Sequence, residues 1–169
     1  DIAKDSQTNL YAAAKGNVRV LFDSLYPVED GFVNIRRVPG LLVGKKGAND
    51  LLKTITGVHK KRLSKSRANR NYFVKLQEQY DCLLAAQGDS PCGKYHYKVV
   101  ANYNQLQKTL QANVGNIAII TSIEGAHAFG CGTSLTAKIP LEIHKKILVE
   151  HISQVKAWEF PPMMVNLSH

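Results

Sequence analysis

The feature that most constrains the fold is an alternation of strand-like and helix-like segments in the second half of the chain. Residues 95–100 and 116–123 are rich in apolar and β-branched side chains, and residues 104–112 between them place Leu106 and Leu110 four apart, on one face of a helix. Parallel neighbouring strands need a crossover, and a helix in that crossover buries a face of the sheet. The pattern therefore predicts an α/β fold with parallel βαβ units.

Further elements are predicted on both sides of this alternation. Upstream, a short helix at 6–15 is stopped by Gly16-Asn17, and a largely buried strand at 18–26 follows it. A loop at 29–47 comes next, then helices at 49–63 and 68–86 and a turn at 87–91. Downstream they are a helix from Pro140 to about Ala157, with an inward face of Ile143, Ile147, Leu148, Ile152 and Val155, and a last strand at 163–167.

The length and composition favour one domain with a real core. The chain has 169 residues, of which 44% are hydrophobic, and no run approaches the roughly 18 consecutive apolar residues of a membrane span. The start at Asp1 has neither an initiator Met nor a signal-peptide pattern, so an internal segment of a longer protein is expected. Three cysteines without metal-type spacing indicate reduced structural thiols and leave the compartment open, with the cytoplasm slightly favoured over a secreted or membrane-anchored location.

The formal charge of +9 is concentrated in one region. Nine Lys and Arg residues lie between Lys45 and Arg70 against Asp50 alone, a net charge of +8. Such a region could follow phosphates, but it lacks the interleaved aromatic residues of a single-strand platform. A solvated, Lys-rich helical face is the preferred interpretation.

The apolar segment at 116–123 ends by placing a carboxylate, Glu124, in a Gly-rich turn. In parallel α/β folds the active site collects at the carboxyl ends of the strands, where this chain places both Glu124 and His169. The glycines at 125, 130 and 132 do not have the dinucleotide-binding spacing. From the residues alone, Glu124 as a helix cap or a solvated side chain remains the simpler interpretation, and His59, His96, His144 and His151 are expected to be exposed and without a role.

Three motifs in this order resemble a known family. They are Ser6-Gln7-Thr8-Asn9-Leu10 with Gly16-Asn17-Val18 and Phe22-Asp23-Ser24-Leu25-Tyr26-Pro27, then Ile123-Glu124-Gly125-Ala126-His127, then Met164-Val165-Asn166-Leu167-Ser168-His169. Across nearly the whole chain they are similar to the membrane dipeptidase (renal dipeptidase) family of zinc-dependent hydrolases, which are amidohydrolase-like (β/α)8 barrels. The Glu-Gly-x-His motif is the most specific of the three.

The resemblance implies a partial (β/α)8 TIM barrel, as a single domain over residues 1–169 with a basic helical insertion at about 45–70. Glu124 would be the carboxylate that bridges two zinc ions. His169 would be the catalytic imidazole that contacts the substrate and stabilises the oxyanion of the tetrahedral intermediate. His127 would support the site or its loop without binding metal.

The implied activity is hydrolysis of a dipeptide or short amide by zinc-activated hydroxide. The family's other metal ligands would precede Asp1 or follow His169, so the segment alone is expected to be inactive. Ala126 and Ser168 depart from the motifs, and they leave the substrate open. A homodimer is compatible with the sequence, and no nucleic-acid partner is expected.

Two other classes remain open. A basic α/β module that binds nucleic acid predicts affinity that falls steeply with salt and depends on Lys60, Lys61 and Arg62. A catalytically inactive, barrel-derived binding protein predicts that the outer metal ligands are missing from the complete protein.

Overall fold

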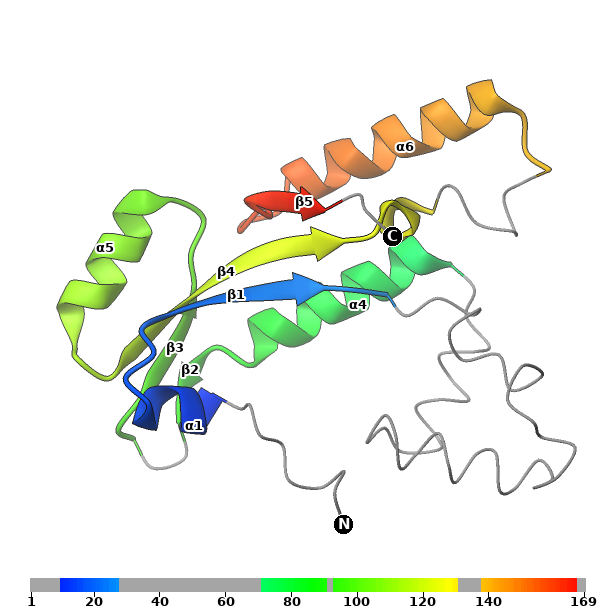
Figure 1. Cartoon of the computed structure of the whole chain (residues 1–169). Helices are drawn as coiled ribbons and strands as arrows, with labels where there is room; N and C mark the ends of the chain where they lie inside the picture. Colours follow the sequence, from blue (N-terminus) through cyan, green and yellow to red (C-terminus); the bar gives the residue numbers. More distant parts are fainter. Residues whose placement is uncertain (1–9, 28–70, 91–92, 131–137, 167–169) are drawn as a thin grey trace, which may run out of the picture. The chain divides into compact units, whose positions relative to one another are not determined.

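The computed structural model describes residues 10–27, 71–90, 93–130 and 138–166 (Figure 1). The chain divides into two compact units, residues 1–7 with 28–71 and residues 8–27 with 72–169. The described residues belong almost entirely to the second unit. The predicted loop at 29–47, the predicted helix at 49–63 and the basic region at 45–70 lie outside the described residues.

Helices and strands alternate over the described part of the chain. Its α-helices are α1 (Leu10–Lys15), α4 (Tyr72–Ala85), α5 (Tyr103–Ala112) and α6 (Leu141–Lys156), and a 3-10 helix, η1, spans Ala126–Phe129. Its strands are β1 (Val20–Leu25), β2 (Gly88–Asp89), β3 (His96–Val99), β4 (Asn116–Glu124) and β5 (Met164–Asn166).

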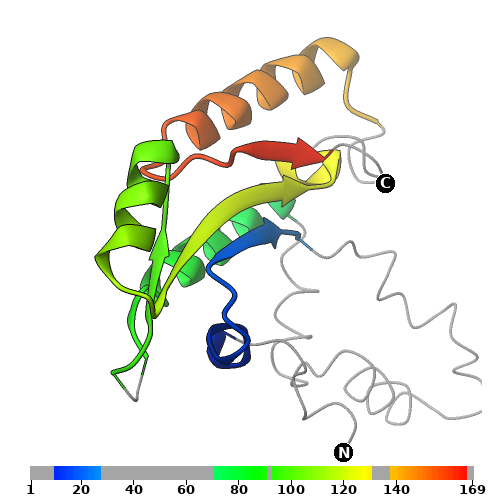
Figure 2. The same ribbon diagram turned by 60° about the vertical axis from the view of Figure 1, so that its left-hand side comes forward.

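Strand β4 is the centre of a five-stranded mixed sheet. Strand β1 runs parallel to β4 along one edge, from the pair Val20–Ala118 to the pair Leu25–Ile123. Along its other edge, β4 pairs in parallel with β3 through its residues 116–119 and with β5 through its residues 122–124. Strand β2 is antiparallel to β3. The predicted α/β class with parallel strands is confirmed, and over the described residues the sheet is open (Figure 2).

Both faces of β4 are covered, which explains the apolar run at residues 117–120. Successive strand residues point to opposite faces. On one face Ile117, Ile119 and Ile123 join a core cluster with α4 and α6, whose members include Phe73, Leu76, Tyr80 and Val155. On the other face, called here the α5 face, Ala118 and Ile120 pack with Leu106 and Leu110 of α5. Ser122 and Glu124 continue the α5 face to the carboxyl end of β4.

Two predictions about burial are wrong. Strand β1 is not largely buried, because the Phe22 side chain on the α5 face is 67% exposed. The inward face predicted for α6 is too wide, since Ile143 and Ile152 are 48% and 39% exposed while Val155 is buried. In both cases the apolar sequence predicts a buried surface. The described elements bury that surface only in part.

Several element boundaries also differ from expectation. The turn predicted at 87–91 contains the two-residue strand β2, because Gly88 and Asp89 pair in antiparallel with Tyr97 and His96. Helix α4 begins at Tyr72, and Asn71 before it is not helical. Helix α5 begins one residue early, where the Asn102 side chain accepts a hydrogen bond from the Gln105 backbone N–H at 3.0 Å. The Gly-rich turn after Glu124 contains η1.

Candidate functional site at the carboxyl end of β4

Glu124 is the last residue of β4 and lies between residues of two neighbouring strands. On one side the Ser24 hydroxyl donates a hydrogen bond to Glu124 Oε2, with Oγ and Oε2 separated by 3.5 Å. On the other side Asn166 of β5 is in register with Glu124. Near the carboxyl ends of three adjacent parallel strands, a hydroxyl, a carboxylate and a carboxamide therefore lie on the same face, with Ser24 one step before the register pair Glu124 and Asn166.

The chain turns sharply directly after Glu124. The Gly125 N–H donates to the Asn166 carbonyl at 2.8 Å, which continues the β4–β5 ladder by one step. Gly125 has a φ of 87°, a region that side-chain-bearing residues rarely adopt. Helix η1 follows at once and ends at Gly130 in the left-handed conformation. Glu124 is thus held between a rigid strand and a short, tightly folded turn.

His127 anchors this turn to the end of β1. Its side chain is buried, and Nε2 lies 2.7 Å from the Pro27 carbonyl oxygen. A carbonyl can only accept, so Nε2 carries the proton in this contact. The ring also meets the rings of Tyr26 and Tyr72 edge to face, with centroids 5.2 and 5.4 Å away. The structure gives His127 an anchoring position, and its relation to a metal site stays a prediction.

His169, the other predicted site residue, lies outside the described residues. The structure therefore places Glu124 and His127, three residues apart on consecutive elements, and describes the strand β5 that leads toward His169. Asn166, three residues before His169, is exposed at the end of that strand.

Two histidines that were expected to be exposed are not. The ring of His151 stacks on Phe73 with centroids 3.7 Å apart, and its Nδ1 lies 2.7 Å from the Phe129 carbonyl oxygen. His144 is half-buried on the same helix, α6. His96 is partly exposed and pairs with Asp89, at 3.0 Å from Nδ1 to Oδ1. His59 lies outside the described residues.

Sequence reasoning missed Ser24, Asn166 and a second carboxylate, Asp23. Burial raises the pKa of Asp23 above its ordinary value of 3.8, because the charged form loses hydration. The signal in the sequence was the pair Asp23-Ser24 inside an otherwise apolar strand. Strand register, which the sequence does not give, decides that Ser24 lies on the α5 face beside Glu124 and Asp23 on the opposite face.

Within the described residues, Glu124 is the candidate metal ligand that the motif resemblance indicates. Among residues 10–27, 71–90, 93–130 and 138–166, no group of three or more His, Cys, Asp or Glu side chains could hold a metal ion. Glu124 fits the requirement for one ligand, because its carboxylate stands at a strand end on a rigid element and offers two oxygens.

Comparisons with known proteins give no assignment. No family model matches the chain, and neither the curated proteins nor the solved structures include a match. None of the helices that the structure describes is long and apolar enough to cross a membrane.

Proposed function

We propose that this chain is part of a metal-dependent hydrolase of the dipeptidase type, which cleaves a dipeptide or short amide. The observation that carries the proposal is the place of Glu124 at the carboxyl end of the central parallel strand, between Ser24 and Asn166. This is the edge at which parallel α/β folds assemble their active sites. The motif resemblance of residues 123–127 supplies the chemical class.

The partial (β/α)8 barrel that we propose as the fold of this enzyme rests on the motif resemblance and on the presence of parallel strands. Strands β1, β4 and β5 run parallel and lie side by side with β4 in the middle (Figures 1 and 2), and β2 and β3 come between β1 and β4 in the chain. Phe22 and Met164 lie on the α5 face and are 67% and 55% exposed. Helix α5 covers part of this same face at Ala118 and Ile120, so the exposed side chains mark apolar surface that another part of the protein would cover.

In the proposed enzyme Glu124 would be one of the residues that hold the zinc ions. Bound in this way, the ions would supply an activated water for attack on the amide carbonyl. The tight turn at Gly125 and the anchored ring of His127 would keep the Glu124 backbone in place. His169, on the chain segment after β5, would contact the substrate and stabilise the oxyanion.

The proposal is tested by the zinc dependence of dipeptide hydrolysis in the full-length protein. A panel of dipeptides is assayed by the release of free amino groups, with the matching tripeptides as controls for general peptidase activity. We expect dipeptide turnover that a chelator abolishes and added zinc restores. Zinc-loaded protein that cleaves no dipeptide or short amide in the panel would contradict the proposal.

A further inference from the structure

The relation between Ser24 and Glu124 suggests a role for a residue that the motifs do not assign. Ser24 is opposite Ser122 in the β1–β4 register, and Ser122 and Glu124 lie on the same face because side chains alternate along β4. Ser24 therefore stands next to Glu124 on the α5 face. Its hydroxyl lies 3.5 Å from Glu124 Oε2, so it donates toward one specific oxygen of the carboxylate.

The Ser24 hydroxyl affects the orientation of the Glu124 carboxylate more than it affects the stability of the chain. An O–H···O separation of 3.5 Å is long, and an exposed pair of this kind adds little to the free energy of unfolding. The glutamate side chain rotates about three bonds, however, and a bridging carboxylate must turn one oxygen to each of two ions. Hydrogen bonds from neighbouring residues commonly orient metal-binding carboxylates in this way.

We propose that Ser24 is a positioning residue for Glu124, whose hydroxyl fixes the orientation in which the carboxylate receives the metal ions. This inference rests on the proposed function. It assigns β1 a part in the site, through a side chain that touches neither metal nor substrate.

The test compares the full-length parent protein, with Ser at position 24, with three variants that carry Thr, Val or Ala there. Ser24→Thr and Ser24→Val are both β-branched, suit a strand, and differ by a hydroxyl against a methyl group. Ser24→Ala removes the hydroxyl without adding bulk. For each protein we would measure zinc affinity by competition with a chelator, then kcat and KM for the best dipeptide of the panel.

The zinc affinities should divide the four proteins by whether residue 24 carries a hydroxyl group. We expect Thr to bind zinc like the parent, and Ala and Val to bind roughly 10- to 100-fold more weakly, with kcat reduced and KM nearly unchanged. Grouping by size, with Thr and Val alike and different from Ser and Ala, would overturn the inference. Equal zinc affinity in all four proteins would do the same.

A parallel Glu124→Gln variant separates the inference from the proposed function. If Glu124→Gln loses zinc while the hydroxyl at position 24 has no effect, the role of Ser24 fails and the hydrolase site stands. If Glu124→Gln keeps both ions, the ligand assignment fails, and the inference about Ser24 fails with it.

Discussion

The imidazole of His127 occupies the space that a Cβ atom on Gly125 would need. A Cβ built there would meet ring atoms Cε1 and Nδ1 of His127, and the Gly125 φ of 87° is itself unfavourable for a residue with a side chain. The glycine after Glu124 is therefore required both by backbone conformation and by the close packing of the ring. The Glu-Gly-x-His spacing has a structural cause that is independent of any metal.

Replacing Gly125 by Ala should destabilise the chain strongly. Backbone strain at positive φ costs about 1–3 kcal/mol, and displacing a buried ring adds about 1–3 kcal/mol. We expect the free energy of unfolding in urea to fall by about 2–6 kcal/mol on these grounds. The double variant Gly125→Ala/His127→Ala removes the clash but keeps the strain, so the two changes should be less than additive. Full additivity would show that the ring and the turn are not coupled.

Arg19 links the start of β1 to the turn between α5 and β4. Its Nε donates to the Asn116 carbonyl at 2.8 Å, and its Nη2 donates to the Leu110 and Asn113 carbonyls at 2.7 and 2.8 Å. Two of these carbonyls lie at the C-terminal end of α5, where a positive charge is favourable. Arg19→Ala should lower the free energy of unfolding by about 2–3 kcal/mol.

Arg19→Lys is the matched control for this prediction. Lysine keeps the charge but cannot present the planar fork of donors, so it should recover only part of the loss. Urea midpoints at constant m-value measure both variants. If Ala and Lys variants match the parent, the three hydrogen bonds contribute nothing to stability.

Asp23 should make stability depend on pH in the direction opposite to a salt-bridged carboxylate. Its pKa is raised by burial, so between pH 3.8 and the higher native pKa the folded chain holds more protons than the unfolded chain. Its contribution to stability therefore falls as the pH rises through this window and is lowest above it. Asp23→Asn, which carries no charge, should be more stable than the parent at pH 7, and the difference should shrink toward pH 4.

Urea unfolding of both proteins at several pH values checks the Asp23 prediction. A variant less stable than the parent at pH 7 would show that the carboxylate has a favourable native partner. Glu150→Gln on the exposed side of α6 controls for the loss of one negative charge.

The elements of the fold were largely predictable, because they follow from local periodicity. The apolar run at 116–123 became β4, and the spacing of Leu106 and Leu110 placed α5 against Ala118 and Ile120. Which strands pair with one another was harder to predict from the sequence. That β5 joins the carboxyl end of β4 while β3 joins its beginning is a long-range register, and local composition does not encode it.

In the candidate site, too, local features could be predicted from the sequence and long-range neighbours could not. Glu124 was found because an apolar strand ends in a carboxylate, a pattern visible in a few consecutive residues. Ser24 and Asn166 come from two other strands, about 100 and 42 positions away along the chain, and only the register brings them beside Glu124. His151 was missed because its burial depends on Phe73 of another helix.

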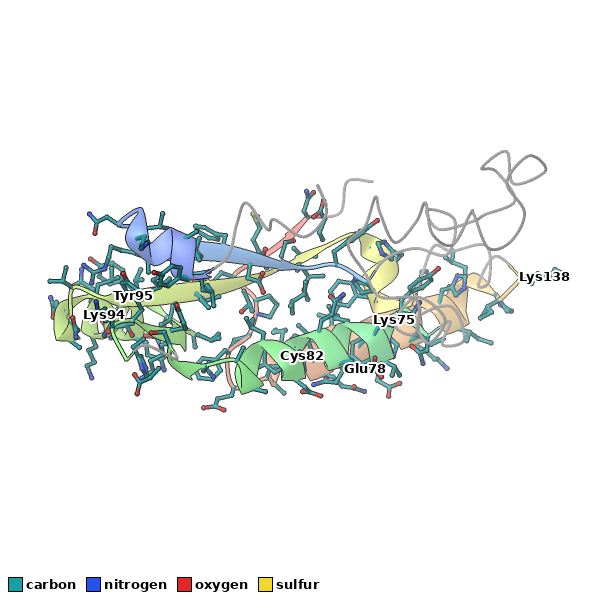
Figure 3. The ribbon with its side chains drawn as sticks, turned by 90° about the horizontal axis from the view of Figure 1, so that it is seen from below. Lys75, Glu78, Cys82, Lys94, Tyr95 and Lys138 are labelled. Carbon is teal, nitrogen blue, oxygen red and sulfur yellow. The ribbon has the colours of Figure 1, made fainter. Side chains whose placement is uncertain are left out.

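The central claim is that Glu124 binds metal, and native mass spectrometry of the full-length protein tests it most directly. Glu124→Gln is compared with the parent and with Glu78→Gln, the same chemical change at an exposed position on α4 (Figure 3). We predict two zinc ions in the parent and in Glu78→Gln, and loss of the two-zinc form in Glu124→Gln. Two zinc ions retained in Glu124→Gln, or none in the parent, would contradict the claim.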